Sequence, residues 1–411
     1  MERIFFLLST VFVFVTGCSN PGNDFSEWRG PNRAGIFYET GLLKSWPEPG
    51  PELLWSVDGL GAGHSSVGIG HNRIFVNGMP DTTGILYSFD LDGNLLWEKM
   101  YGAEWHKSYT GPRSTPVVAG DLVYLESGMG VVYCMDAFSG DIVWEVDLLN
   151  RFDAENIQWG MTENLLVDGG NIICTPGGER HNVVALNRFT GETVWTSPGH
   201  GEPAAYCSPV LVEHNTARLV VTMTATSIIG LDAGTGEMYW RVEQMQRNKI
   251  HANSPVYENG IIYCSSNSAP QSSGIVALQL SDDGKSVEQK WRNESFRNLM
   301  GGIVLIDGVI YGATYRKNQW SAIDASTGEE KILSEDVGGG VILYADGLFY
   351  LYSEDGEVVL VNMDRNTFDI KGRFEVPLGT GQHWAHPVIQ DKRMYIRHGD
   401  ALMVYDIFRY I

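Results

Sequence analysis

The chain has 411 residues, and its 29 basic and 50 acidic side chains give a formal net charge of −21. This balance disfavours nucleic acid and anionic membrane surfaces as main partners, because both require clustered Lys and Arg. Hydrophobic residues make up 43% of the chain, and no stretch after residue 20 has apolar spacing of helical period, so the chain is predicted to be nearly all β. The charge serves either solubility or an acidic docking surface, and both interpretations stay open.

The first 18 residues have the pattern of a bacterial lipoprotein signal peptide. The apolar run 5–15 is too short to span a bilayer, and the sequence VTGC at 15–18 resembles a lipobox. Acylation of Cys18 would place the protein in the outer membrane, facing the periplasm or the cell surface. Residues 19–50 are then a tether and leader before one domain at 51–411. A simple secretory signal with an incidental Cys18 is the alternative.

The other cysteines are scattered and carry no metal-ligand spacing. They are Cys134, Cys174, Cys207 and Cys264. Three of them lie in strand-like runs, where a free cysteine behaves as a small buried hydrophobe. We expect no disulfide among the four.

One unit recurs along the chain and ends in tryptophan. Its copies place Trp97, Trp144, Trp195, Trp240 and Trp291 at spacings of 47, 51, 45 and 51 residues. This length accommodates four short strands, which is one blade of a β-propeller. The Trp follows a glycine-containing turn, as in the Asp-x-x-Thr-Gly turn 232–236 before Trp240, and we expect its flat ring to stack on the backbone of the next blade where a glycine allows close approach.

Three further copies are degenerate. Those starting at Gly302 and Val341 carry Ile332 and Ile370 in place of Trp, and the copy starting at His386 stops after its third strand. The segment 51–59 can supply the missing fourth strand with its Trp55, because closing a ring from both termini leaves no open edge. We therefore predict eight blades, with a seven-bladed ring as the alternative.

The docking pattern A-x-D-x-x-T-G-x-x-x-W resembles that of pyrroloquinoline-quinone (PQQ) repeat propellers. The leader segments WRGPNR at 28–33 and GLLKSW at 41–46 are similar to those of the BamB-like subgroup of this family. The resemblance implies one of two activities. Quinoprotein dehydrogenases hold PQQ and usually Ca²⁺ in the funnel of the ring, whereas the lipoprotein of the outer-membrane barrel-assembly machinery holds no cofactor and serves as a docking scaffold.

The residues that the quinoprotein resemblance would require are mostly missing. The chain has no adjacent cysteines to cover the quinone, and no Asp stands where the catalytic base is expected, within residues 297–302. Glu179 and Asn267 lie in segments that resemble those supplying calcium ligands, and carboxylate and amide oxygens suit this ion. The interpretation of both residues as ordinary loop residues is favoured over a calcium site, so neither PQQ nor calcium is expected.

Superposing the repeats predicts which residues meet at one mouth of the central channel. Counting three residues back from the proline of a first strand gives Arg113, Tyr206 and Trp384, and the equivalent positions of the other repeats hold His64, Thr162, Ala252, Met300 and Gly339. Immediate neighbours add Trp159, Glu163, His251, Asn253, His383 and His386. These polar and aromatic groups either form a ligand pocket or plug the channel through a water network.

We therefore expect a monomeric, lipid-anchored binding or scaffold protein with no catalytic residues and no nucleic-acid partner. Its partner is a protein or a small polar ligand bound at the funnel. The alternative is a PQQ-dependent dehydrogenase that oxidises an alcohol or a sugar.

Overall fold

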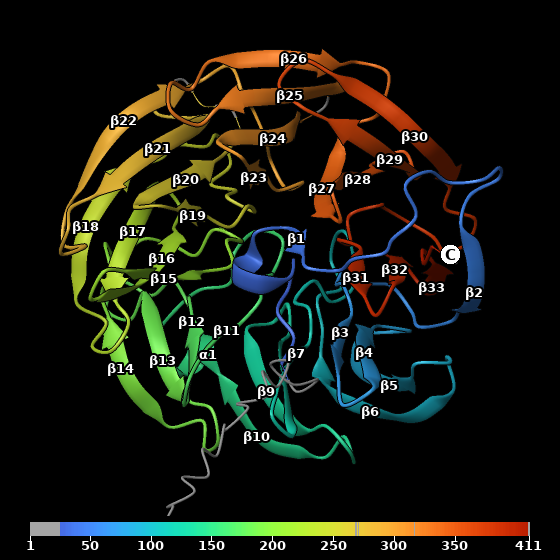
Figure 1. Cartoon of the computed structure of the whole chain (residues 1–411). Helices are drawn as coiled ribbons and strands as arrows, with labels where there is room; N and C mark the ends of the chain where they lie inside the picture. Colours follow the sequence, from blue (N-terminus) through green and yellow to red (C-terminus); the bar gives the residue numbers. More distant parts are fainter. Residues whose placement is uncertain (1–24, 268, 270, 316, 410–411) are drawn as a thin grey trace, which may run out of the picture.

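The structure is a computed structural model that describes residues 25–409 except 268, 270 and 316. Cys18 and the predicted signal peptide lie outside the described residues. The strands form a ring of eight four-stranded antiparallel blades, one of which gains a short parallel leader strand as its fifth, and this confirms the predicted eight-bladed β-propeller (Figure 1).

Blades one to four follow the predicted repeats in chain order. They consist of β3 (Gly68–Gly70), β4 (Arg73–Gly78), β5 (Thr83–Asp90) and β6 (Leu95–Ala103); β7 (Val117–Ala119), β8 (Leu122–Glu126), β9 (Val131–Asp136) and β10 (Ile142–Asp147); β11 (Leu166–Asp168), β12 (Asn171–Cys174), β13 (Val183–Asn187) and β14 (Thr193–Ser197); and β15 (Val210–His214), β16 (Ala217–Met223), β17 (Ser227–Asp232) and β18 (Met238–Glu243). The short helix α1 (Leu148–Arg151) links blades two and three.

Blades five to seven complete the consecutive part of the ring. They consist of β19 (Val256–Glu258), β20 (Ile261–Ser265), β21 (Ile275–Leu280) and β22 (Val287–Asn293); β23 (Val304–Ile306), β24 (Val309–Thr314), β25 (Gln319–Asp324) and β26 (Glu330–Ser334); and β27 (Gly340–Ala345), β28 (Leu348–Ser353), β29 (Glu357–Met363) and β30 (Phe368–Glu375).

Blade eight combines strands from both ends of the chain, as predicted. Its strands β31 (Val388–Gln390), β32 (Arg393–His398) and β33 (Ala401–Asp406) are completed by β2 (Glu52–Val57). Strand β2 runs antiparallel to β33, with Glu52 opposite Asp406 and Val57 opposite Leu402. The ring therefore has no unpaired seam between its first and last blades.

The blade-closing tryptophans join neighbouring blades in the predicted way. The indole N–H groups of five of them donate to backbone oxygens of the following blade, at N···O distances of 3.0–3.1 Å; these are Trp55, Trp144, Trp195, Trp240 and Trp291. The glycine of the turn allows the contact, since a Cβ at Gly236 (φ +75°) would lie 2.4 Å from the Trp195 ring.

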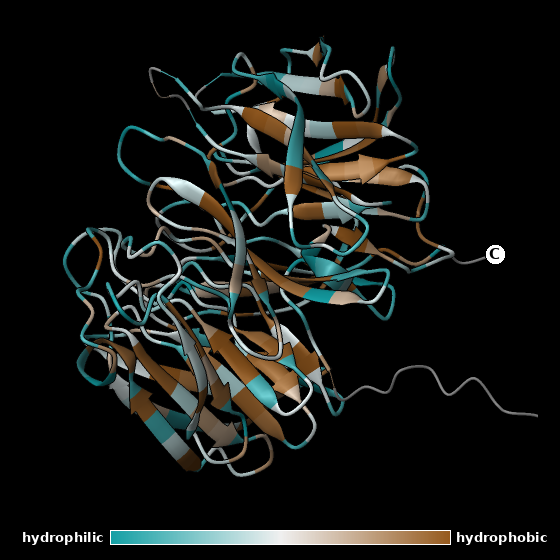
Figure 2. Cartoon of the chain, turned by 90° about the vertical axis from the view of Figure 1, so that its left-hand side faces the viewer, coloured by the Kyte–Doolittle hydropathy of each residue, from teal (hydrophilic) through white to brown (hydrophobic). Residues whose placement is uncertain are grey.

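Hydrophobic clusters between the sheets form the core, and Figure 2 shows hydrophobic residues concentrated on the strands and hydrophilic ones in the connecting loops. The four described cysteines are buried in the core as free thiols, and burial raises the pKa of Cys134 to about 12. None of the helices in the described part of the chain is long and apolar enough to cross a bilayer.

The leader crosses the central channel of the ring. The turn η1 (Pro31–Arg33) and β1 (Ile36–Phe37) lie at the centre in Figure 1, and β1 pairs in parallel with β27. Arg33 is buried, forms an ion pair with Glu27 and donates to the carbonyl oxygens of Asn164 and Leu165, both at 2.7 Å. The leader is therefore part of the folded ring from Phe25 onward.

The ring has two different faces. At the entry face each innermost strand begins. At the turn face the first and second strands of a blade are joined, and so are the third and fourth, because Leu122 at the start of β8 pairs with Asp136 at the end of β9. The described chain starts at the turn face, where Phe25 pairs with Ala119 at the end of β7.

Candidate functional site

A pocket of about 600 Å³ opens at the entry face. Seven of the eight positions predicted by superposing the repeats line it; these are His64, Arg113, Thr162, Tyr206, Ala252, Met300 and Trp384. Each lies just before a first strand, where all blades converge on the channel axis. The repeat register alone therefore located the wall of the pocket.

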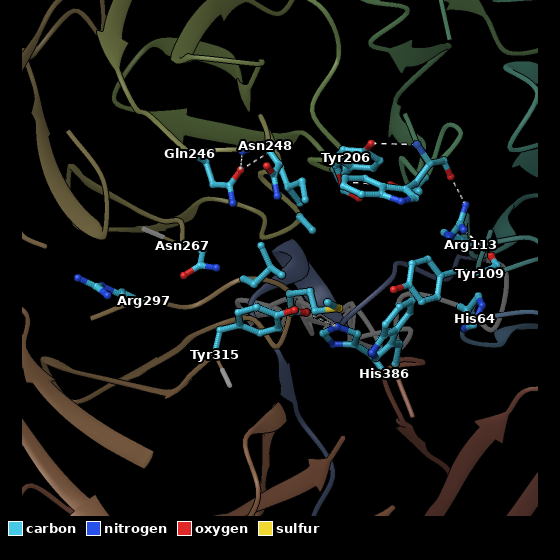
Figure 3. A pocket seen from close by; sticks show the side chains of 18 of the residues that line it. His64, Tyr109, Arg113, Tyr206, Gln246, Asn248, Asn267, Arg297, Tyr315 and His386 are labelled. Atoms are coloured by element: carbon cyan, nitrogen blue, oxygen red, sulfur yellow. Dashed lines mark hydrogen bonds between the residues drawn. The ribbon is translucent and has the colours of Figure 1, made fainter. Parts of the chain in front are cut away.

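The leader supplies the floor of the pocket. Trp28 lines the pocket from within the channel, and its ring lies 4.9 Å from that of His386. The guanidinium of Arg29 donates from Nη1 to Nδ1 of His386 at 2.9 Å, and burial next to this cation lowers the pKa of His386 well below its usual range. His386 is thus neutral, with Nε2–H donating to the carbonyl oxygen of Met300 at 3.1 Å. Figure 3 shows the ribbon of η1 behind the pocket side chains.

Arg113 is held in the wall by the backbone. Its guanidinium donates to the carbonyl oxygens of Ser108, Tyr109 and Trp159, the first at 3.1 Å. These bonds use three of the five N–H groups, so two remain for a ligand. Burial lowers the pKa of Arg113 to about 10, so the side chain is still a cation at neutral pH.

Aromatic rings surround this cation. The Trp159 and Tyr206 rings lie 6.1 Å apart, and the Trp384 ring lies 4.9 Å from that of Tyr109 and 5.2 Å from that of His64. Tyr109 (φ 50°) and Tyr206 (φ 71°) occupy the left-handed backbone region, which is costly for aromatic residues and concentrates at ligand sites. Burial and the charge of Arg113 lower the pKa of His64 to about 3, so this side chain is neutral.

The charge of the pocket is opposite to that of the protein. Its wall includes Arg113, Arg247, Arg297 and Lys317, and none of the described residues that line it is Asp or Glu. Figure 3 shows Arg113 and Arg297 on opposite sides of the cavity. In a chain with 50 acidic residues, this arrangement concentrates positive potential at one cavity, which suits an anionic group.

Sequence reasoning missed three of these cations. Arg247, Arg297 and Lys317 are exposed side chains in loops of different length, whereas superposition aligns only positions next to the first strands. A clustering of basic residues in the loops of the entry face was the available signal.

Five predicted residues lie outside the wall, namely Glu163, His251, Asn253, Gly339 and His383. Glu163, His251 and Asn253 are buried neighbours of wall positions, and adjacent residues of an extended segment point in opposite directions. Asn253 donates to Asn298 Oδ1 at 2.6 Å, and Glu163 accepts from the backbone N–H of Thr175 at 2.9 Å. Asn253 and Glu163 thus connect segments inside the ring, and His251 is buried there as well.

The two candidate calcium ligands are not brought together at the pocket. Asn267 lines it, whereas Glu179 is exposed and is not among the lining residues. Within the described part of the chain, no group of three or more His, Cys, Asp or Glu residues is placed to hold a metal ion.

The sequence profile of the family described as outer membrane protein assembly factor BamB matches residues 82–332. The chain is 28% identical to the protein of that name from Kangiella koreensis over 183 residues, which are 43% of this chain and 42% of that protein. Less than half of that relative is therefore spanned. The protein of the same name from Moranella endobia is 23% identical over 344 residues, covering 76% of this chain and 80% of the relative.

Solved structures share the fold. BamB from Moraxella catarrhalis superposes with a TM-score of 0.63 at 14% identity, covering 88% of this chain and 98% of that one. The quinohemoprotein alcohol dehydrogenase from Comamonas testosteroni superposes with a TM-score of 0.62 at 12% identity, covering 92% and 80%. At these identities the likeness concerns the fold alone, whereas the sequence profile extends over more than half of the chain. The protein is thus a member of the BamB family of outer membrane protein assembly factors.

Proposed function

We propose that this propeller is a protein-binding scaffold in outer membrane protein assembly, anchored through a lipid at Cys18 and facing the periplasm. The profile match over residues 82–332 carries this proposal, together with the curated relatives named for that role. The closed ring supports it, because a propeller offers a rigid surface on which loops can present a binding site.

The entry-face pocket is the proposed binding site of this scaffold. Its four cations, its aromatic wall and the lack of carboxylates among its described lining residues favour an acidic segment of a protein partner or a small anionic ligand. The exposed Arg297 and Lys317 can attract such a group, and Arg113 offers it a fixed guanidinium.

The proposed assembly role is tested by measuring the amounts of folded outer-membrane proteins in cells. Deleting the gene should lower the amount of correctly folded outer-membrane proteins, and the wild-type gene should restore it. The variant Arg297→Ala/Lys317→Ala should restore it only in part, because two of the four pocket cations are removed. Arg180→Ala/Lys290→Ala is the matched control, since both residues are exposed and lie outside the pocket. Unchanged outer-membrane proteins after deletion would contradict the assembly role.

A calcium-dependent quinoprotein dehydrogenase is the second candidate, favoured by the fold and by a pocket of suitable size. The donor set does not fit its calcium ion, because the described lining residues include no carboxylate and Glu179 lies outside the pocket. We therefore derive no redox step. Purified protein mixed with PQQ and calcium, and assayed for dye-linked oxidation of alcohols and sugars, tests this candidate directly.

A further inference from the structure

Three phenylalanines are exposed on the turn face, close to where the described chain begins. Phe25, Phe138 and Phe189 are 52%, 46% and 53% exposed. Phe138 and Phe189 occupy the turns between the third and fourth strands of blades two and three. Rings that stay exposed add no stability to the fold, and several exposed apolar groups on neighbouring turns are typical of a surface that contacts a partner or a membrane.

The repeats show that these turns do not require phenylalanine. In seven blades the same residue of the turn donates its backbone N–H to an Asp or Asn Oδ1 two positions earlier, at 2.6–3.0 Å; these residues are Asp92, Phe138, Phe189, Gly234, Ser326, Asn366 and Phe408. The hydrogen bond involves only backbone of that residue, and polar residues or glycine serve in four blades. Phe408 is partly covered by the leader, since Leu42 pairs with it. The exposed phenyl rings of blades two and three are therefore not required for the structure of the turn.

The three rings belong to one patch with two arginines, and His71 joins its two edges: the His71 ring lies 5.0 Å from that of Phe138, and its Nε2 lies 3.0 Å from the carbonyl oxygen of Gly120, next to Ala119. Phe25 pairs with Ala119, whose carbonyl oxygen accepts from Arg188 Nη1 at 2.8 Å, and the Arg188 guanidinium lies 4.3 Å from the Phe189 ring centre.

The other edge of the patch is built in the same way. The Arg73 guanidinium lies 5.0 Å from the Phe138 ring centre and donates to the carbonyl oxygens of Ala137 and Phe138. We call these five residues, Phe25, Arg73, Phe138, Arg188 and Phe189, the aromatic turn patch.

The predicted anchor at Cys18 lies close to this patch along the chain. Only seven residue steps separate Cys18 from Phe25, which limits the distance between them to about 25 Å. Since Phe25 belongs to the patch, a lipid on Cys18 brings the patch to within this distance of the bilayer. The pocket lies on the opposite face.

We propose that the aromatic turn patch rests on the surface of the phospholipid bilayer that holds the anchor, so that the entry-face pocket points away from the membrane. This inference rests on the proposed lipid-anchored scaffold. The phenyl rings enter the interface, while the arginines keep their charged ends at the phosphate level. Asp121, Asp136 and Asp141 surround the patch, so the fitting surface is a zwitterionic bilayer and not an anionic one.

Single cysteine labels on the anchored full-length protein test the orientation. The four described cysteines are buried, so a polarity-insensitive fluorophore can be placed selectively at Ser139→Cys, next to Phe138, or at Lys317→Cys in the pocket wall. The protein is reconstituted into phosphatidylcholine vesicles that contain a headgroup-level nitroxide lipid. We expect quenching about threefold stronger at position 139 than at 317, because interfacial groups lie within 5–10 Å of the headgroup boundary.

A second set of variants distinguishes the effect of the phenyl rings on orientation from that of the tether. Phe138→Ser/Phe189→Ser, combined with Ser139→Cys, should reduce quenching to the level at position 317, and serine is the residue of blade six at this turn position. Melting curves of the variant should match the parent protein, because both rings are about half exposed.

Each remaining outcome contradicts a defined part of the inference. Equal quenching at positions 139 and 317 overturns the orientation. Strong quenching at 139 that survives the double substitution shows that the tether alone orients the ring, and overturns the role of the patch. Protein that does not sediment with the vesicles contradicts the proposed anchor and the orientation that rests on it, whereas sedimenting protein without quenching contradicts the orientation alone.

Discussion

The blades that keep the tryptophan and the blades that lack it are joined by different means. From blade eight round to blade six, most joints use an indole hydrogen-bonded to the next blade, such as Trp195 to the Ala233 carbonyl oxygen at 3.1 Å. Blades six and seven carry Ile332 and Ile370 instead, and Ile332 is 49% exposed. Among the described residues, no outer-strand indole donates across the two joints that follow; ring contacts cross them instead, between Tyr311 and Phe349 at 4.7 Å and between Phe374 and Tyr405 at 4.9 Å.

The leader reinforces the blades that lack the tryptophan. Arg29 donates to the carbonyl oxygens of Ile303 in blade six, at 3.0 Å, and Ile342 in blade seven, at 3.4 Å. Trp46 packs against Phe374 of blade seven, with ring centres 5.3 Å apart. Together with the pairing of β1 with β27, these contacts make the leader, a segment distant in sequence, do at blades six and seven what the tryptophans do at the other joints. A degenerate repeat thus marks where another part of the chain supplies the packing.

The largest effect should follow from removing the leader and β2 together. Deleting residues 1–60 exposes the outer edge of β33 and removes the contacts of Arg29 and Trp46. We expect loss of cooperative unfolding, because the deletion removes both the Trp55 joint between blades eight and one and the leader contacts of blades six and seven. Thermal unfolding followed by circular dichroism measures this, and a truncated protein with an unaltered Tm would refute closure by β2.

The next effect compares the two kinds of joint directly. Trp195→Ala should destabilise the protein by about 3–5 kcal/mol, because a buried ring and its hydrogen bond are lost. Ile332→Ala, at the equivalent position, should cost less than about 1 kcal/mol, since the side chain is half exposed. Urea unfolding of both variants tests this difference. Equal costs would mean that Ile332 fills the tryptophan position.

Removing the buried Arg29 side chain should lower the free energy of unfolding more than removing an exposed arginine. Arg29→Ala removes the guanidinium donor from four buried carbonyl oxygens, of which that of Gly301 still accepts from the backbone N–H of Ile342, and from His386 Nδ1; we expect a loss of about 2–4 kcal/mol. Arg180→Ala is the control, because its ion pair with Asp153 is exposed and contributes little. If both variants unfold at the same urea concentration, the leader does not hold blades six and seven.

The smallest effect concerns a buried carboxyl group in the tryptophan-joined half. Burial raises the pKa of Glu163 above its usual range, with Arg33 of the leader acting in the opposite direction. Because the folded pKa is raised, the group contributes stability at low pH, and this contribution is lost as pH rises towards the folded pKa. Glu163→Gln should therefore raise the Tm by about 2 °C near pH 9 and change it little near pH 5. An equal shift at both pH values would show that ionisation of Glu163 is not involved.

Much of the site could be predicted because the repeats share one register. Counting back from each first strand located seven wall positions, including Arg113, Tyr206 and Trp384. The same reasoning wrongly placed the neighbours Glu163 and His251 in the wall. Side chains alternate in direction along an extended segment, so these two are buried inside the ring. Arg297 and Lys317 lie in loops, whose paths depend on contacts distant in sequence.

The sequence by itself determined the fold, the number of blades and their closure by Trp55. These features follow from local patterns, namely strand length, turn residues and a tryptophan at a fixed position, which each blade satisfies within itself or with its neighbour. Only the tertiary structure decided that the leader fills the channel, that four cations meet at one mouth and that Phe138 and Phe189 join Phe25 in one patch. These arrangements bring together residues that no repeat relates, so their positions depend on how the closed ring places one loop beside another.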